Sequence, residues 1–241
     1  MDGISNIVTT NQDGIHPDLE KIVLKHMTHM WRGPIHPATQ NAFDSVSSTL
    51  QSLKEQGKPW ILDSGCGVGE STLKLAQLYP GHFILGVDRS EIRLDKASIK
   101  SQKPIIINPN TRNTKNFQFI RAELGDFWRL LLKNDLYPAQ HYILYPNPYP
   151  KKMHIKKRFH GDASLREILL LCPHLELRSN WKLYLSEFQF AVNNGSKILG
   201  LKSFRDGTLS QLNPTQESAW TLFEKKFSAS GQDIYSLRFN S

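Results

Sequence analysis

A buried strand that runs directly into a glycine-rich turn most constrains what this chain can fold into. The apolar run at 60–62 ends at Asp63 and continues as DSGCGVGES, which has glycine at every second position of the turn: Gly65, Gly67 and Gly69. Glycines there let the backbone turn sharply and bring a ligand against the main chain. The stretch therefore predicts a strand, a turn and a helix, and leaves two interpretations of the turn, a ligand site or a plain connection.

Strand patterns and helical patterns alternate along most of the chain. Strands are predicted at 60–67, 82–90, 116–124, 140–148 and 180–188, and helices at 38–56, 70–80, 91–100, 125–135 and 162–176. The stretch 221–239 reads as two strands around Ser-Gly-Gln-Asp, which indicates a hairpin. This alternation predicts an α/β fold with a doubly wound, mostly parallel sheet and a C-terminal antiparallel hairpin.

The length of 241 residues suits one α/β domain or two small ones. We expect a single domain over residues 31–241, with an N-terminal tail and lead-in segment over residues 1–30. The first fourteen residues are polar and are expected to form a loose tail. An insert at 103–116 places three isoleucines among proline, asparagine and basic residues, and both a short strand and a surface excursion fit it.

The chain is basic, with a net charge of +8 and a pI of about 9.4. This excess favours a polyanionic partner, such as nucleic acid or an anionic membrane surface. No apolar run approaches the roughly 20 residues of a membrane span, and the N-terminus lacks the pattern of a secretion signal. Cys66 and Cys172 are far apart, so we expect no metal site and no disulfide framework, and a cytoplasmic location.

Acidic residues stand where three predicted strands end: Asp63, Asp88 and Glu123. A dinucleotide-binding turn would need a third glycine at the position of Glu70, and a pyrophosphate would face carboxylates, which disfavours an oxidoreductase. The turn instead fits a cofactor with positive charge and no phosphate, and S-adenosyl-L-methionine is such a molecule.

Ligands of open α/β sheets bind at the carboxyl ends of the strands, so these acids and the turn glycines are the predicted cofactor site. Asp63 can face the ammonium of the cofactor directly or through water. Asp88 can bind both ribose hydroxyls, and Glu123 can accept a hydrogen bond from the adenine amino group.

A stiff aromatic loop follows the strand at 140–148 and leads into a cationic segment. Prolines fix the backbone of the sequence YPNPYP, which would hold Asn147 and Tyr149 in place beside the methyl group of the cofactor. Asn147 can read a base edge, and Tyr149 can stack on a base or pack in the wall of the site. Five basic residues follow, suited to RNA phosphates or to a solvated face: Lys151, Lys152, Lys156, Lys157 and Arg158.

The order and spacing of these elements resemble the bacterial, single-chain tRNA (guanine-N7)-methyltransferase family. That family has a Gly-rich first turn, an acid after the second strand, and a P-D-P-W-P-K-x-R-H-x-K-R-R loop after the fourth. Here the loop runs from Pro146 to Arg158, and the family's terminal T-x-F-E segment corresponds to residues 221–224. The likeness extends from about Trp31 to the end of the chain, without the insert.

The resemblance implies methylation of a guanine N7 at position 46, in the variable loop of tRNA, with S-adenosyl-L-methionine as donor. It assigns the cofactor acids named above, Asn147 and Tyr149 at the catalytic loop, and a substrate-binding set: Lys151, His154, Lys156, Lys157, Arg158, Thr221 and Glu224. Asn147 replaces the loop aspartate of the family, Tyr149 its tryptophan and Met153 one arginine. The replacement of this aspartate by Asn147 implies weaker guanine binding or another substrate.

Two alternatives stay open. Asn-Pro-Tyr partly matches the N-P-P-Y loop of methyltransferases that act on exocyclic amines, one residue short. A non-catalytic paralogue that binds RNA or a protein partner also fits the loss of the loop carboxylate. The expected partner is tRNA or another structured RNA, with no membrane association, and the protein is expected to be a monomer or homodimer.

Overall fold

The computed structural model describes residues 6–101, 116–201 and 207–240, so the insert predicted at 103–116 lies almost wholly outside the described residues. The chain forms two compact units, one of residues 34–144 and one of residues 1–33 together with 145–241. The single domain expected over residues 31–241 remains a prediction.

Four parallel strands form the sheet of the unit at 34–144, in the order β3-β2-β1-β4. They are β1 (Trp60–Ser64), β2 (Phe83–Asp88), β3 (Phe117–Arg121) and β4 (Gln140–Leu144). Every residue of β1 is buried, as expected for a central strand covered on both faces. The register pairs Asp63 with Gly86 and Asp88 with Arg121, which brings the carboxyl ends of the strands to one edge.

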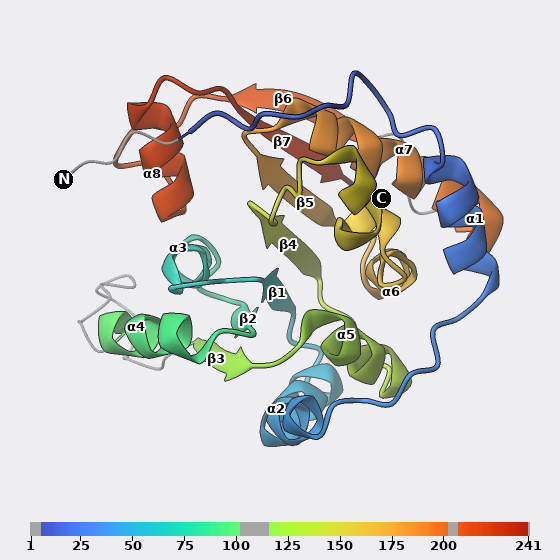
Figure 1. Ribbon diagram of the computed structural model, residues 1–241. Helices are drawn as coiled ribbons and strands as arrows, with labels where there is room; N and C mark the ends of the chain where they lie inside the picture. The colour runs from blue at the N-terminus through green and yellow to red at the C-terminus, as the bar shows by residue number, and fades with distance from the viewer. Residues whose placement is uncertain (1–5, 102–115, 202–206, 241) are drawn as a thin grey trace. The chain divides into compact units, whose positions relative to one another are not determined.

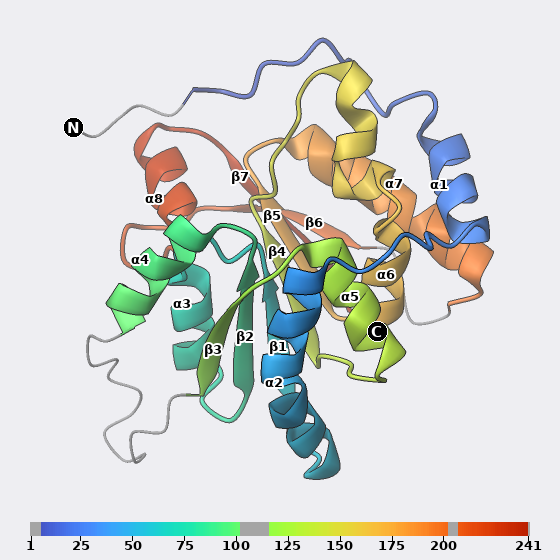
Figure 2. The same ribbon diagram turned by 60° about the horizontal axis from the view of Figure 1, so that its bottom comes forward.

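Helices cover both faces of this parallel sheet (Figure 2). The helices are α2 (Pro37–Glu55), α3 (Glu70–Leu78), α4 (Glu91–Ser101) and α5 (Leu124–Lys133). α2 and α5 pack together on one face, where the rings of Phe43 and Phe127 meet edge to face at 5.9 Å. α3 and α4 lie on the other face. This is the doubly wound arrangement that the alternating pattern predicts.

The first turn of α3 lies very close to the sheet because β2 carries a glycine there. A Cβ atom at Gly86 would lie 2.5 Å from Oγ1 of Thr72 and 2.9 Å from the ring of Phe119. No larger residue fits without displacing the helix. The glycine thus lets the hydroxyl groups of α3 reach the end of β1.

Three antiparallel strands form the sheet of the other unit, in the order β5-β7-β6. They are β5 (Leu175–Ser179), β6 (Thr208–Leu212) and β7 (Ile234–Phe239). Its helices are α1 (Leu19–Thr28), α6 (Leu165–Leu171), α7 (Lys182–Leu199) and α8 (Leu222–Ala229), with the short 3-10 helices η1 (Lys152–Lys157) and η2 (Phe159–Gly161). α1 and α7 lie side by side (Figure 1).

The strand predicted at 180–188 is wrong, because α7 begins at Lys182 and runs for 18 residues. Tyr184, Leu185 and Phe188 begin a helical stripe that is buried along α7. The strand in this part of the chain is β5, which begins at Leu175, within the last two residues of the helix predicted at 162–176. α6 ends before Pro173, which cannot continue it, and the chain extends from Leu175 onward.

The tight hairpin predicted at 221–239 is also wrong, since α8 occupies its first half. Thr221 caps this helix by accepting a hydrogen bond from the backbone N–H of Glu224 at 3.0 Å. The Thr-x-x-Glu spacing is a helix-start signal, and it places a helix before the Ser-Gly-Gln-Asp turn. The antiparallel C-terminal strands exist, but β7 pairs with β6, and α8 lies between them in the chain.

The loose tail predicted for the first fourteen residues is wrong for residues 10–12. Thr10 and Asn11 bond to the backbone near Pro150, and Gln12 is buried. Among the described residues, no helix combines the length and apolarity that crossing a bilayer requires.

Candidate functional site

Asp63 is buried at the end of β1 and is held by the first turn of α3. Its Oδ2 accepts hydrogen bonds of 2.6 Å from the hydroxyls of Ser71 and Thr72. Its other oxygen, Oδ1, is buried and has no hydrogen-bond partner among the described residues. A buried carboxylate oxygen without a partner is costly, and an ammonium group would satisfy it.

Burial raises the pKa of Asp63 to about 6, hydrogen bonds from Ser71 and Thr72 oppose this rise, and the charge of Asp88 adds to it. The carboxylate form therefore costs free energy in the protein alone at pH 7. A positive ligand beside Oδ1 would remove that cost.

The glycine turn between β1 and α3 has an open side. Gly65, Gly67 and Gly69 all have positive φ, at 77°, 57° and 77°. A Cβ at Gly65 would meet nothing within 4 Å, and one at Gly67 would meet a single backbone oxygen at 4.0 Å. A ligand can therefore lie against the backbone of these two glycines.

Gly69 serves a different purpose from the other two glycines of the turn. A Cβ there would lie 2.7 Å from Cβ of Ala97 and 2.7 Å from the ring of Phe119. Gly69 therefore permits close packing of α4 and β3 against the turn, and its predicted contact with a cofactor remains a prediction.

Asp88 is the second carboxylate at this sheet edge, at the end of β2, and it is 4% exposed. It joins two loops, because Oδ2 accepts from the N–H of Gly67 at 2.9 Å and Oδ1 from the N–H of Ser90 at 2.8 Å. A carboxylate has about four acceptor positions, so it can still bind hydroxyl groups of a ligand.

Glu123 is exposed and lies two positions after the end of β3, at the edge of the sheet where it was predicted as a site residue. Its side chain caps α5 by accepting from the N–H of Asp126 at 3.0 Å. Its own N–H donates to Oγ1 of Thr39 at 3.1 Å. The three predicted acids thus stand at the carboxyl ends of three adjacent parallel strands, where α/β sheets bind ligands.

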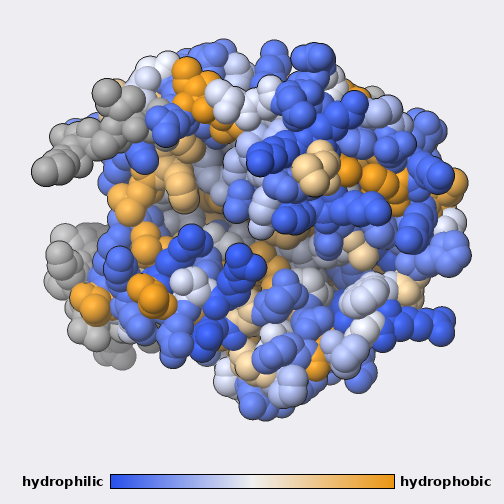
Figure 3. Space-filling model, viewed as in Figure 1, coloured by the Kyte–Doolittle hydropathy of each residue, from blue (hydrophilic) through white to orange (hydrophobic). Residues whose placement is uncertain are grey.

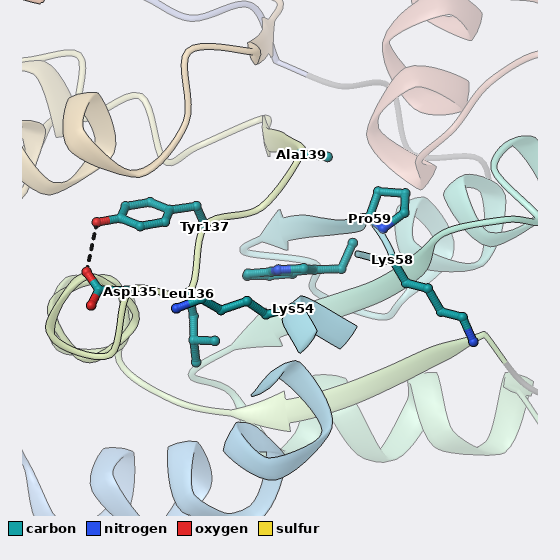
Figure 4. Close-up of a pocket in the computed structure, with 8 residues that line it drawn as sticks. Lys54, Lys58, Pro59, Asp135, Leu136, Tyr137 and Ala139 are labelled. Atoms are coloured by element: carbon teal, nitrogen blue, oxygen red, sulfur yellow. Dashed lines mark hydrogen bonds between the residues drawn. The ribbon is translucent and has the colours of Figure 1, made fainter. Parts of the chain in front are cut away.

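A pocket of about 210 Å³ lies at the opposite, amino-terminal end of β1 (Figure 4). Lys54, Lys58, Trp60 and Tyr137 are among the residues that line it. The hydroxyl of Tyr137 donates to Asp135 at 3.3 Å on the exposed rim. This pocket is remote from the acidic edge, since the ends of a strand lie apart, and it carries none of the predicted site residues.

The loop at 145–151, here called the proline loop, belongs to the other unit. Asn147 is exposed, and its Oδ1 accepts from the N–H of Tyr149 at 3.4 Å. Tyr149 has a φ of 43°, an uncommon value for a non-glycine residue. Its ring lies edge to face with His154, and the ammonium of Lys157 stands 5.8 Å from its centre.

Four lysines of the cationic segment are exposed on or beside η1: Lys151, Lys152, Lys156 and Lys157. Met153 is 81% exposed among them. Partial desolvation and the charges of Lys157, Lys151 and Arg158 lower the pKa of His154, so the lysines supply the positive charge at neutral pH. In Figure 3, hydrophilic side chains cover much of the face on which this segment lies.

Arg158 is not on this surface, contrary to the prediction that it contacts substrate. It is 0% exposed, and its Nη1 donates to Oε2 of Glu187 at 2.5 Å. Its guanidinium also lies over the ring of Trp181 at 4.8 Å. A buried arginine paired with a carboxylate has a structural role and no surface for a phosphate.

Thr221 and Glu224 are also buried. Oε1 of Glu224 accepts from Arg178 at 2.9 Å, and Oε2 accepts from the N–H of Trp220 at 2.5 Å. The guanidinium of Arg178 stacks at 3.7 Å on the ring of Trp220. The predicted terminal pair thus fixes the start of α8, and its contact with a substrate remains a prediction.

Comparison with known proteins identifies the family. Residues 57–237 match a family model described as "Putative methyltransferase" (Methyltransf_4), and this match covers most of the chain. The chain belongs to this methyltransferase family.

Relatives and solved structures agree with this methyltransferase membership. The chain is 27% identical over 197 residues to a tRNA (guanine-N(7)-)-methyltransferase of Limosilactobacillus reuteri, covering 79% of this chain and 84% of the relative. It is 25% identical over 223 residues to the protein of that name from Cytophaga hutchinsonii, covering 89% and 96%. A solved structure named "Structure of an Antibiotic Related Methyltransferase" aligns with a TM-score of 0.54 at 19% identity, covering 82% and 94%.

These similarities confirm both the resemblance seen in the sequence and the α/β class I methyltransferase fold. Several residues that support the candidate site and the proline loop were not predicted from the sequence. Ser71 and Thr72 follow the glycine turn, in the first turn of α3. Two adjacent hydroxyl residues at a helix start are a signal from which their role could have been predicted. Gln12 and Glu187 are 175 positions apart in the chain, and no local pattern links them.

Replacing Asp63 by asparagine should stabilise this methyltransferase in the absence of ligand. Because the pKa of Asp63 is raised, the ionised form costs free energy above pH 6, and asparagine removes that cost while keeping an acceptor for Ser71 and Thr72. We expect a gain of about 1 to 3 kcal/mol in the free energy of unfolding at pH 7, measured by denaturant titration.

The gain should fade as the pH falls from about 6 to 3.8, where Asp63 is protonated in the folded and then in the unfolded state. Asp95→Asn on the exposed side of α4 is the matched control and should change little. A loss of stability in Asp63→Asn at pH 7 would show that the charge of Asp63 has a compensating partner.

Proposed function

We propose that this chain is an S-adenosyl-L-methionine-dependent tRNA methyltransferase that methylates N7 of a guanine. The observation that carries the cofactor assignment is the buried Oδ1 of Asp63, which has no partner within the described part of the chain, beside the open backbone of Gly65 and Gly67. The relatives named tRNA (guanine-N(7)-)-methyltransferase support the substrate and the methylated atom.

The acidic sheet edge fits the chemical groups of S-adenosyl-L-methionine. Asp63 would hold the ammonium through Oδ1, and Asp88 would accept from the ribose hydroxyls with its remaining lone pairs. Glu123 is exposed at the third strand end and would accept from the adenine amino group. When bound, the cofactor supplies an electrophilic methyl group on a sulfonium.

Guanine N7 carries a lone pair in its neutral form, so this chain needs no strong general base. The contribution of the chain is to orient N7 and to exclude other orientations of the guanine. Asn147 offers one carbonyl acceptor and one amide donor where a carboxylate stands in the resembling family. It can hydrogen-bond a guanine edge but adds no negative charge, which predicts weaker binding of guanine than a carboxylate would give.

Tyr149 and the exposed lysines would bind the rest of the RNA. The lysines of η1 can contact phosphates, and the affinity from such contacts depends on salt and hardly on sequence. Tyr149 lies among His154 and Lys157 and can stack on a base next to this cationic surface.

The direct test is transfer of a labelled methyl group from S-adenosyl-L-methionine to purified tRNA, followed by nucleoside analysis. We expect the label in 7-methylguanosine. Asp88→Ala is the control, because it removes the proposed ribose contact, and transfer should fall at least about tenfold. Label on an exocyclic amine would support the alternative substrate class, and a wild-type protein that binds no cofactor would overturn the proposal.

Charge reversal on η1 should weaken RNA binding and flatten its salt dependence. The double variant Lys156→Glu with Lys157→Glu should reduce the slope of log affinity against log salt by about 2, as each phosphate contact contributes about one. Fluorescence anisotropy with labelled tRNA at several salt concentrations measures this slope.

The matched control is Lys54→Glu with Lys58→Glu, which makes the same change in net charge at the pocket beside the amino-terminal end of β1. It should lower affinity modestly through net charge alone and leave the slope nearly unchanged. Equal slopes in both double variants would mean that η1 is a solvated face and no RNA contact.

A further inference from the structure

The N-terminal segment bonds directly to the proline loop, from which it is separated by about 140 positions in the chain. The hydroxyl of Thr10 donates to the carbonyl oxygen of Pro150 at 2.7 Å. The N–H of Lys152 donates to Oδ1 of Asn11 at 3.0 Å. These two bonds hold the chain on both sides of Lys151, where the cationic segment begins.

A third link runs through the interior, by way of Arg158. Its Nη1 donates to Oε1 of Gln12 at 3.1 Å as well as to Glu187. Its Nε and Nη2 both donate to the carbonyl oxygen of Tyr149, at 3.2 and 3.1 Å. One buried guanidinium thus connects the N-terminal segment to the middle of the proline loop.

Glu187, on α7, is the anchor of this connection and has no exposed surface. Its Oε1 accepts from the side chain of Gln12 at 2.5 Å and from the N–H of His16 at 2.8 Å. Oε2 bonds to the ring of His160 at 3.0 Å as well as to Arg158. Burial favours the neutral acid, but the hydrogen bonds from His160, His16 and Gln12 outweigh it and lower the pKa of Glu187 to about 2.

The proline loop needs such external support. Pro146, Pro148 and Pro150 have no N–H group, so they cannot donate backbone hydrogen bonds that would fix the loop. Tyr149 between them has a φ of 43°, which costs free energy and persists only where neighbouring groups enforce it. Its carbonyl oxygen is the atom that Arg158 holds with two donors.

We propose that Thr10, Asn11 and Gln12 form a positioning strap that sets the geometry of Asn147 and Tyr149 on the proline loop. Arg158 and Glu187 transmit the contact of Gln12. The strap lies outside the segment at 57–237 that matches the family model. This inference rests on the proposed function, since it assigns the strap to the loop that would orient the guanine.

The test uses Thr10→Val with Asn11→Ala in the full chain. Both residues are exposed, so the folded protein should survive the change. We expect kcat for tRNA methylation to fall about tenfold, with KM for tRNA and the affinity for S-adenosyl-L-methionine nearly unchanged. Hydrogen exchange at the amide of Lys152, which loses its acceptor, should become faster in the same variant.

Two matched variants separate positioning from general stability. Asn11→Asp keeps an acceptor oxygen for the N–H of Lys152 and, combined with native Thr10, should retain nearly full kcat. Thr9→Val changes an exposed neighbour of Thr10 in the same chemical way and should have no effect. A decrease in kcat that Thr9→Val shares would mean that the segment contributes only general stability.

The outcomes distinguish the strap from the function on which it rests. If wild-type protein methylates no RNA, the proposed function fails, and hydrogen exchange at Lys152 still reports whether the strap holds the loop. If the wild type is active and the double variant keeps both its kcat and its slow exchange, the strap is overturned.

Discussion

The carboxylate of Asp63 is the group on which the ligand-binding half of this protein depends. It closes the central strand, fixes the start of α3 through two hydroxyls, and leaves one buried oxygen that no other described residue pairs with. The fold supports this arrangement with Gly86, which lets Thr72 approach, and with Asp88, which ties Gly67 to the second strand. Such a site is strained without a cation and complete with one, as expected of a binding site that is formed before its ligand arrives.

The unit of residues 1–33 and 145–241 has a different role, because it holds a loop of three prolines in one conformation. It uses buried charge, with Arg158 and Glu187 at the centre and no exposed surface on either side chain. Breaking such a pair leaves a buried charge uncompensated, so the arrangement is strongly specified. A similar pair, Arg178 with Glu224, fixes the start of α8. Arg158, which looks like a substrate contact in a linear motif, is thus part of the support beneath the surface.

The sequence predicts the parallel half of the fold well because each element there carries its own local signal. The strand, glycine turn and helix around Asp63 are contiguous, Asp88 is the last residue of β2, and Glu123 stands two positions after the end of β3. The sequence predicts the antiparallel half of the fold less well. The start of α7 carries an apolar run at 183–185, which fits a strand as well as a helix, and α8 lies in the chain between the paired strands β6 and β7.

The residues of the candidate site also differ in how well the sequence predicts them. The acids and glycines of the turn were predictable because their role follows from position at a strand end. The burial of Arg158 could not be predicted, because nothing in a run of basic residues distinguishes a buried arginine from exposed lysines. Its partners, Gln12 and Glu187, are 175 positions apart in the chain, and tertiary structure alone brings them together.

The ionisation of Asp63 itself tests the central claim most directly. Carbon-13 NMR of the Asp63 carboxyl group, titrated without ligand, should give a pKa of about 6. Saturating S-adenosyl-L-methionine should lower this value, because an ammonium beside Oδ1 favours the carboxylate. A pKa at or below the ordinary 3.8 in the protein alone, or one that S-adenosyl-L-methionine leaves unchanged, would contradict the account.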